Sequence, residues 1–241
     1  MPDTLRTEER ISTRRTLTDE VMEKVQQMVR CGELRAGKLY SVYQLAEALG
    51  ISRSPVRDGL LKLEAAGLVG FERNRGFRVT VPSARQIVEI FAIRLALEPP
   101  AVARVAAHRD PAVAGRLRQT MAAMEKAAAS LDEPSFWAHD QDFHNTILTA
   151  AGNSQAATVV RDLRERTRLI GPGTTTAARS LPAVAAEHRP VLDAIAAGDG
   201  VTASARMRAH LEATGRLLSA QTAAVPSDDP GVDALWRDIV G

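Results

Sequence analysis

The chain has 241 residues, of which 45% are apolar and 25% charged, while aromatic residues make up only 4%. This length allows two domains of ordinary size, and the composition is typical of a helix-rich globular protein rather than of a disordered one. The sequence has no apolar run near the roughly 20 residues that span a bilayer and no apolar signal core, so we expect a cytoplasmic protein. Cys31 is the only cysteine, which excludes an internal disulfide and a cysteine-rich zinc site.

The formal net charge of +2 is too small to indicate a nucleic-acid partner, but the charges are unevenly distributed. Residues 1–80 contain 14 Lys and Arg against 11 Asp and Glu, whereas the rest of the chain contains 17 against 18. An ordinary solvated surface can also carry an excess of three positive charges. An argument for DNA binding therefore has to rest on where these residues lie.

The first 80 residues contain a pattern of three short helices. Residues 1–16 are polar and without periodicity, which predicts a flexible arm. Apolar positions then recur at helical spacing and predict a first helix; a second fits 42–49 and ends at Gly50, and a third has Pro55 in its first turn. Two helices joined by about four residues around a glycine are typical of a helix-turn-helix, although ordinary helical hairpins share this pattern.

The next segment separates these two interpretations. Two short runs rich in β-forming residues, 68–71 and 77–81, flank an arginine-containing turn at 72–76. A two-stranded wing after a helix-turn-helix predicts a winged-helix domain over 17–81, and Pro and Ser at 82–83 then form a hinge.

From residue 84 to 222, Pro and Gly delimit helical segments, and no β-rich run occurs. The expected helices span roughly 84–107, 111–130, 134–150, 154–170, 180–197 and 200–222. The predicted fold class is therefore mainly α, with an N-terminal winged helix-turn-helix and a C-terminal antiparallel bundle of six or seven helices. Pro99 and Pro100 should kink the first bundle helix or break it in two. The sequence indicates no function for the C-terminal tail, residues 223–241.

The motifs along the chain resemble those of one family of regulators. The run LAEALGISRSPVR from Leu45 to Arg57, followed by the turn Asn-Arg-Gly at 74–76, resembles the winged helix of GntR-family regulators. Later motifs resemble the ligand-binding FCD bundle of the FadR-like subfamily: Arg94 and Glu98, Asp140-Gln141-Asp142-Phe143-His144, Gly152-Asn153, Glu187-His188, Ala194-Ile195, Gly198-Asp199 and His210-Leu211. The resemblance implies a homodimeric transcription regulator whose bundle binds a divalent metal and a small organic acid that controls DNA binding.

The chain departs from the family pattern at two places. Tyr43 and Gln44 stand where the family usually has an arginine before the Glu-Leu-Ala run, and the third helix reads Arg-Asp-Gly-Leu rather than Arg-Glu-Ala-Leu. These differences predict an unusual operator sequence. Gly59 within a helix costs about 1 kcal/mol relative to alanine, and the sequence offers no compensation for it.

The candidate DNA contacts lie on the third helix and the wing. Arg53 and Arg57 are four residues apart and project from one face, where a recognition helix presents arginine to guanine edges in the major groove. The serines suit phosphate contacts, and the wing brings positive charge to the backbone or the minor groove. The whole set is Ser52, Arg53, Ser54, Arg57, Arg73, Arg75 and Gly76. A single arginine more often only solvates a surface, but the set on both elements predicts binding to a palindromic operator as a dimer.

The resemblance assigns four residues of the bundle to a metal. Asp140 and His144 are four residues apart and point to the same place, and His188 and His210 lie inside the fifth and sixth bundle helices. By itself, Asp-x-x-x-His is weak evidence, because a histidine on a helix is usually a surface or hydrogen-bonded residue. Three imidazoles and one carboxylate suit zinc, nickel or another first-row divalent ion.

Arg94 is the expected partner of an anionic effector, because a guanidinium can hold a carboxylate through two parallel bonds. The alternative for this residue is an intrahelical ion pair with Glu98. The alternative for the whole protein is a metal-dependent enzyme fused to a DNA-binding domain, since three histidines and a carboxylate can also activate water. We predict no enzyme, because the sequence identifies no general base for such a reaction. A helical scaffold without a ligand would leave buried polar groups without partners.

Overall fold

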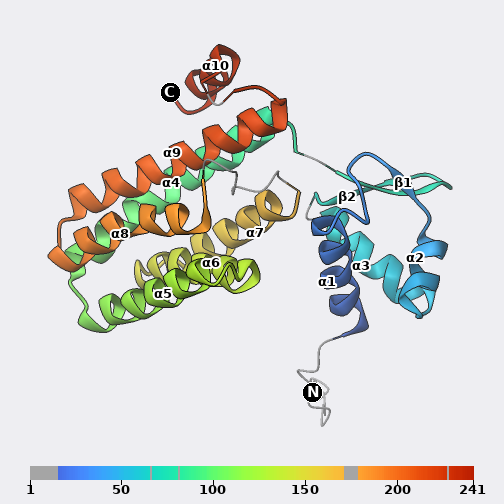
Figure 1. The fold of residues 1–241 in the computed structure, drawn as a ribbon, viewed down its shortest axis with the longest axis horizontal. Coiled ribbons are helices and arrows are strands. Elements are labelled where there is room, and N and C mark those ends of the chain that lie inside the picture. Colours follow the sequence, from blue (N-terminus) through green and yellow to red (C-terminus); the bar gives the residue numbers. More distant parts are fainter. Residues whose placement is uncertain (1–15, 66, 81, 171–178, 227) are drawn as a thin grey trace, which may run out of the picture. The chain divides into compact units, whose positions relative to one another are not determined.

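The computed structural model describes residues 16–65, 67–80, 82–170, 179–226 and 228–241. The predicted arm at 1–16 therefore lies outside the described residues, apart from Thr16. The chain divides into two compact units, Met1–Thr80 and Val81–Gly241. Figure 1 shows strands in the first unit only, whereas the second consists of helices. The predicted fold class, a winged helix-turn-helix followed by an all-α bundle, is confirmed.

The first unit contains three helices and a small antiparallel sheet. The helices are α1 (Leu17–Arg30), α2 (Val42–Leu49) and α3 (Arg53–Ala65), and the strands are β1 (Leu39–Tyr40), β2 (Val69–Glu72) and β3 (Gly76–Val79). The strand order is β1-β3-β2, so the expected two-stranded wing is corrected to a sheet of three strands. With only two residues, β1 is too short to show the alternation of apolar and polar residues from which a strand is predicted.

Two glycines of this unit allow close approach of neighbouring backbones. A Cβ at Gly59 would lie 2.7 Å from Val21 Cγ1 and 3.2 Å from Thr18 O, so α1 packs directly on the α3 backbone. Gly76 has φ +132, and a Cβ there would overlap the carbonyl oxygen of Tyr40 in β1. Gly59 is therefore explained by helix packing, and Gly76 by its positive φ together with the β1–β3 pairing.

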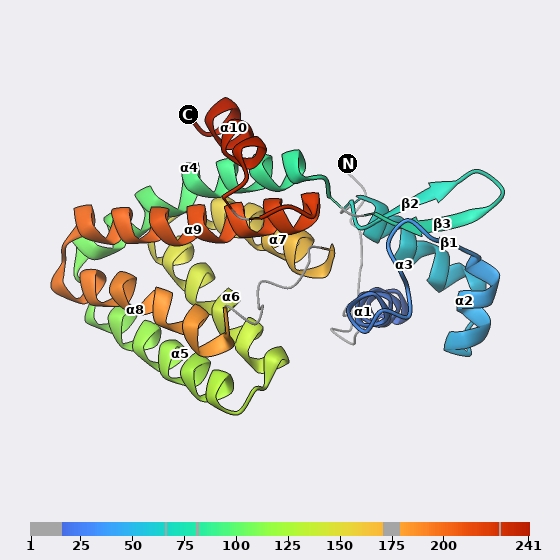
Figure 2. The same cartoon turned by 45° about the horizontal axis from the view of Figure 1, so that its top comes forward.

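The second unit is a bundle of long helices with one short helix at its end. In chain order they are α4 (Ala84–His108), α5 (Pro111–Ala129), α6 (Glu133–Ala150), α7 (Ser154–Ile170), α8 (Leu181–Ala197), α9 (Gly200–Ala223) and α10 (Pro230–Ile239). Figures 1 and 2 show α4 and α9 side by side along their length, with α8 beside α9 and α5. The core contains fully buried Phe91, Phe136, Phe143 and Met121.

Pro99 and Pro100 do not break α4, which continues as one helix through both residues. Each proline removes one helical hydrogen bond. However, Glu98, Pro99 and Val102 are buried, and Gly200 of α9 is so close that a Cβ there would lie 2.8 Å from Ala103 O. Packing against α9 therefore holds this part of α4 in place, and of the two expected outcomes, a kink or a break, the break does not occur.

The C-terminal tail contains α10, which packs on the bundle. Trp236 is 2% exposed, with its ring centre 6.5 Å from that of Phe91 in α4, and the guanidinium of Arg216 lies 5.2 Å from the Trp236 ring centre. Asp238 forms an ion pair with Arg85 at 3.3 Å. The last helix therefore joins the end of the chain to the first turns of α4 and the end of α9.

The contact between α9 and α10 depends on Gly215. A Cβ at this position would lie 2.6 Å from Phe91 Cγ and 2.6 Å from Trp236 Cζ2. We expect Gly215→Ala to displace α10 and to lower the free energy of unfolding by about 1–3 kcal/mol, because overpacking outweighs the gain in helix propensity. Thermal unfolding and tryptophan fluorescence measure these effects.

Gly115→Ala is the matched control, since Gly115 also lies within a helix but a Cβ there meets nothing within 4 Å. This variant should be neutral or more stable by up to about 1 kcal/mol. Equal melting temperatures for the two variants would contradict the packing described for Gly215.

Candidate functional site

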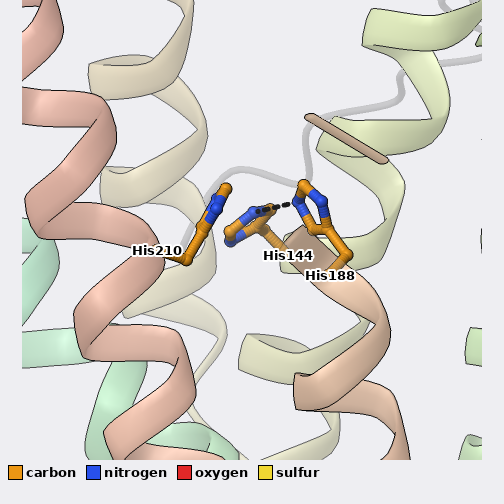
Figure 3. Close-up of side chains that lie close together, drawn as sticks. All are labelled: His144, His188 and His210. Atoms are coloured by element: carbon orange, nitrogen blue, oxygen red, sulfur yellow. Dashed lines mark hydrogen bonds between the residues drawn. The ribbon is translucent and has the colours of Figure 1, made fainter. Parts of the chain in front are cut away.

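Three histidines from different helices meet inside the bundle. His144 lies on α6, His188 on α8 and His210 on α9, and their exposed fractions are 0%, 0% and 8%. Figure 3 shows the three rings pointing toward one another. One ring nitrogen of each histidine lies within 4.8 Å of the corresponding nitrogens of the other two. This arrangement provides three nitrogen ligands for one metal ion.

Asp140 lies at the same place, one helical turn before His144 on α6. Its Oδ1 is 3.0 Å from His188 Nε2, and His188 Nε2 is 3.3 Å from His144 Nε2. The ring centres of His188 and His210 are 4.4 Å apart. The structure thus brings together all four residues that the sequence proposed as metal ligands.

The opposite side of each imidazole is held by a hydrogen-bond acceptor. The three pairs are His144 Nδ1 with Glu98 Oε2, His188 Nδ1 with Val184 O at 3.0 Å, and His210 Nδ1 with Glu187 Oε2 at 2.9 Å. Carboxylates and carbonyls only accept hydrogen bonds, so each Nδ1 carries the hydrogen and donates it. In a neutral ring this leaves Nε2 with a free lone pair, which is the form that binds metal.

Burial favours the neutral form of two of these rings, His144 and His210. Desolvation, together with the nearby charge of Arg164, lowers the pKa of His144 to about 3. Desolvation and the neighbouring His188 lower the pKa of His210 to about 4. Burial alone would raise the pKa of Asp140, but the neighbouring charge of Arg164 holds it well below its ordinary value. At neutral pH, lone pairs of imidazole nitrogens and an ionised carboxylate therefore converge.

Such a set of acceptors fits a bound cation. Acceptor atoms that face one another without a hydrogen between them repel, and a positive ion at their centre removes this repulsion. Three imidazole nitrogens and one carboxylate oxygen suit zinc, nickel or another first-row divalent ion. Asp140, His144, His188 and His210 would hold the ion.

Three arginines stand behind the carboxylates of this site. Arg94 Nε donates to Glu98 Oε1 at 2.7 Å, so the intrahelical pair considered for this residue forms. Arg164 of α7 pairs with Asp140. The sequence analysis missed Arg164, because α7 carries several arginines at surface spacing and only the packing of α7 on α6 distinguishes this one.

The third arginine, Arg179, precedes α8. It makes two bonds to Glu187, from Nε at 2.9 Å and from Nη2 at 2.6 Å, and Nη2 also donates to Thr214 Oγ1 at 2.9 Å. The sequence analysis did not identify it either, because neither its position before a helix nor its spacing indicates these partners.

The candidate DNA-reading residues lie on the first unit. Ser52, Ser54, Arg53 and Arg57 are exposed at the start of α3, whereas Val56 of the same turn is fully buried. The exposed residues therefore lie on the face of α3 opposite the core of the unit, as a recognition helix requires.

Aromatic and acidic neighbours orient some of these arginines. The guanidinium of Arg57 lies 5.9 Å from the ring centre of Phe71 in β2. In the wing, Arg73 and Arg75 are exposed, and Arg75 Nη1 lies 3.1 Å from Glu72 Oε2. Gly76 is placed by the close contact with β1, as described above. No helix in the described parts of the chain is long and apolar enough to cross a membrane.

Two family models match the two units. The model for bacterial regulatory proteins of the gntR family matches residues 17–79, and the FCD domain model matches residues 89–213. The second match alone covers more than half of the chain.

Curated relatives and solved structures agree with this assignment. The chain is 32% identical over 203 residues to an HTH-type transcriptional regulator in an unstable DNA locus of Streptomyces ambofaciens, covering 83% of this chain and 84% of the relative. It is 30% identical over 224 residues to a "Probable D-xylose utilization operon transcriptional repressor" of Paenarthrobacter nicotinovorans, covering 92% and 94%. A GntR transcriptional regulator from Rhodococcus sp. RHA1 has the same fold, with a TM-score of 0.67, 24% identity and coverage of 87% and 98%.

These matches join a winged helix and a helical bundle in the order in which this chain has them, and the proteins concerned are regulators rather than enzymes. The chain belongs to the gntR family of bacterial regulatory proteins, with an FCD domain after its winged helix, and is a DNA-binding transcriptional regulator.

Proposed function

We propose that the operator affinity of this regulator is controlled by a small organic acid bound at a divalent metal ion in the second unit. Asp140, His144, His188 and His210 hold the metal. The observation that carries this proposal is the convergence of imidazole Nε2 lone pairs on an ionised carboxylate, with 3.0 Å between His188 Nε2 and Asp140 Oδ1. Burial without a compensating cation would leave these acceptors unsatisfied.

Arg94 is the proposed partner of the acid. The side chain is 3% exposed, and its Nη2 has no hydrogen-bond partner among the residues that the structure describes. An unpaired buried guanidinium N–H is costly, and a ligand carboxylate would satisfy it. In this arrangement the acid contributes an oxygen to the metal, while Arg94 binds the acid from α4.

The first unit reads DNA in this proposal. The start of α3, with Ser52, Arg53, Ser54 and Arg57, enters the major groove, and Arg73 and Arg75 of the wing contact the backbone or the minor groove. Because one recognition helix reads only a few base pairs, we propose that a homodimer binds a palindromic operator. Repression is the proposed outcome, since a relative with 30% identity is named a repressor.

The acid must bind two arrangements of the dimer with different affinity if it is to change DNA binding. A coupling of this kind is typically about 1–3 kcal/mol between two sites. The connection at residues 82–83, immediately before the capped start of α4 at Ala84, is the covalent link through which the bundle acts on the winged helix.

Arg57 and Arg75 should affect DNA binding differently. Arg57→Ala removes a contact to base edges, so we expect a loss of about 1–3 kcal/mol and a relaxed preference at one base pair. Arg75→Ala removes a phosphate contact, so all sequences should weaken by a similar factor and the salt dependence should decrease. Titration of the operator and of single-base variants by fluorescence anisotropy, at several salt concentrations, measures both effects. If Arg57→Ala bound all these sites as the wild type does, α3 would not be the recognition helix.

The metal site is tested by changing one ligand and one supporting residue. We expect His188→Ala to lose the metal and the response to acid but to keep operator binding, because the change is confined to the second unit. Glu187→Gln should weaken metal binding about 10–100-fold, since it removes the charged acceptor behind His210. Metal content by mass spectrometry and competition with a chelating dye provide the measurements.

His108→Ala is the matched control, because His108 is an exposed histidine of the same unit and is outside the cluster. It should bind metal as the wild type does. A folded His188→Ala protein with unchanged metal affinity would contradict the assignment of the ligands.

The metal-free protein should lose stability on mild acidification. In the folded chain the pKa of His144 is about 3 and that of His210 about 4, against 6.5 in the unfolded chain, so the unfolded state binds more protons below pH 6.5. Their contribution is therefore complete above pH 6.5 and is lost as the pH falls toward 4. We expect the melting temperature of chelator-treated protein to be level above pH 7 and to fall steadily between pH 6.5 and 4.5. His210→Gln should reduce this slope and His108→Ala should not; an unchanged slope in His210→Gln would show that the ring is not buried and neutral.

A further inference from the structure

Three arginines around the metal site each keep one buried N–H without a partner. These groups are Arg94 Nη2, Arg164 Nε and Arg179 Nη1, and none has a hydrogen-bond acceptor within the described part of the chain. We propose, on the basis of the function proposed above, that the effector is a dianion with two carboxylates, and that Arg179 binds the carboxylate that is distal to Arg94. The balance of charges in the site and the positions of the three arginines both lead to this class of ligand.

The buried charges balance before the metal is added. Glu98, Asp140 and Glu187 are the carboxylates that lie beside the histidine rings. Arg94, Arg164 and Arg179 each pair with one of these carboxylates, so the three negative charges match three positive ones. A divalent ion among neutral imidazoles then adds two positive charges in a region with little solvent.

An uncompensated buried charge is strongly unfavourable. A monocarboxylate would neutralise one of the two added charges, whereas a dicarboxylate would neutralise both. The charge count therefore favours the dianion, and the free N–H groups provide donors for more than one carboxylate.

The donors lie at two ends of the site. Arg94 and Arg164 belong to one end. Arg94 pairs with Glu98, which contacts His144, and Arg164 pairs with Asp140, one helical turn before His144. A carboxylate bound there would be close to Asp140, with which Arg164 pairs. This end accommodates the carboxylate that coordinates the metal.

Arg179 belongs to the other end, behind Glu187 and His210. The ring centres of His144 and His210 are 5.5 Å apart. Glu98 lies behind the first ring and Glu187 behind the second, so the histidine cluster separates the two carboxylates. If Arg179 only positioned Glu187, its two bonds to that carboxylate and its bond to Thr214 would suffice. The buried Nη1 is left over, and a second carboxylate of the ligand would satisfy it.

Calorimetry with zinc-loaded, full-length protein tests this inference. The probes are pairs of acids of equal chain length that differ in one carboxylate: malonate with propionate, succinate with butyrate, and glutarate with valerate. At least one dicarboxylate should bind at least about tenfold more tightly than its partner, because its second carboxylate gains charge-assisted hydrogen bonds. Arg179→Gln should abolish this preference in protein that still contains zinc, as measured by mass spectrometry.

Two further variants separate binding from positioning. Arg189→Gln is the matched control, since Arg189 is an exposed arginine of α8 that pairs with Glu125 outside the site, and it should keep the preference. If Arg179→Gln loses zinc or unfolds, Thr214→Val takes its place, because it removes only the hydroxyl that helps to hold the guanidinium; it should reduce the preference while zinc stays bound.

The possible results test three claims separately: the two carboxylates of the effector, the role of Arg179 and the acid site itself. Equal affinity for both members of every pair, with zinc retained, would overturn the dianion and leave the proposed acid site intact. A preference for dicarboxylates that persists in Arg179→Gln would overturn the role of Arg179. If neither class binds the zinc-loaded protein at millimolar concentration, the acid site of the proposed function is itself wrong.

Discussion

The hydrogen bonds on the Nδ1 side of the three histidines determine what the bundle can bind. A buried neutral imidazole can present either nitrogen as an acceptor, and the acceptor on its other side decides which one. Glu98, Val184 O and Glu187 all require a hydrogen on Nδ1, so Nε2 is the nitrogen that each ring leaves free to accept. Helices α4, α6, α8 and α9 each contribute to these pairs, so helix packing and ligand geometry depend on each other. A shift of one helix would separate a ring from its acceptor.

Sequence reasoning found the parts of the site that local spacing defines. Asp140 and His144 follow from the i,i+4 rule, whereas the addition of His188 and His210 depended on the family resemblance. The residues that it missed, Arg164 and Arg179, act across helices, and their partners are 24 and 8 residues away in the chain. The same limit applies to the fold. The helices of the bundle were predicted from Pro, Gly and periodicity, but the pairing of β1, the close contact at Gly59 and the continuity of α4 through Pro99 arise from tertiary packing.

The first unit shows why net charge alone indicated so little about DNA. Part of the N-terminal excess of Lys and Arg is used inside the wing, where Glu72 pairs with both Arg75 and Arg78. Arg78 is only half-exposed and also contacts Gly37 O, so it supports the sheet. The exposed residues at the start of α3 and at the turn of the wing are few, and their position on two neighbouring elements is more informative than their number.

Under the proposed function, metal and acid are linked by the charge of the site. The three carboxylates of the site are paired with three arginines, so their charges cancel. An acid that entered the metal-free site would add negative charge to this neutral region, and the cost of desolvating the acid would oppose binding. With the divalent ion present, the same acid removes an excess of positive charge. Linkage is reciprocal: the factor by which the metal strengthens acid binding is also the factor by which the acid strengthens metal binding. Under the proposed function, the effector therefore changes operator binding according to its concentration and also stabilises the metal-loaded bundle. A regulator of this kind responds to the acid only in cells that supply enough metal to fill the site.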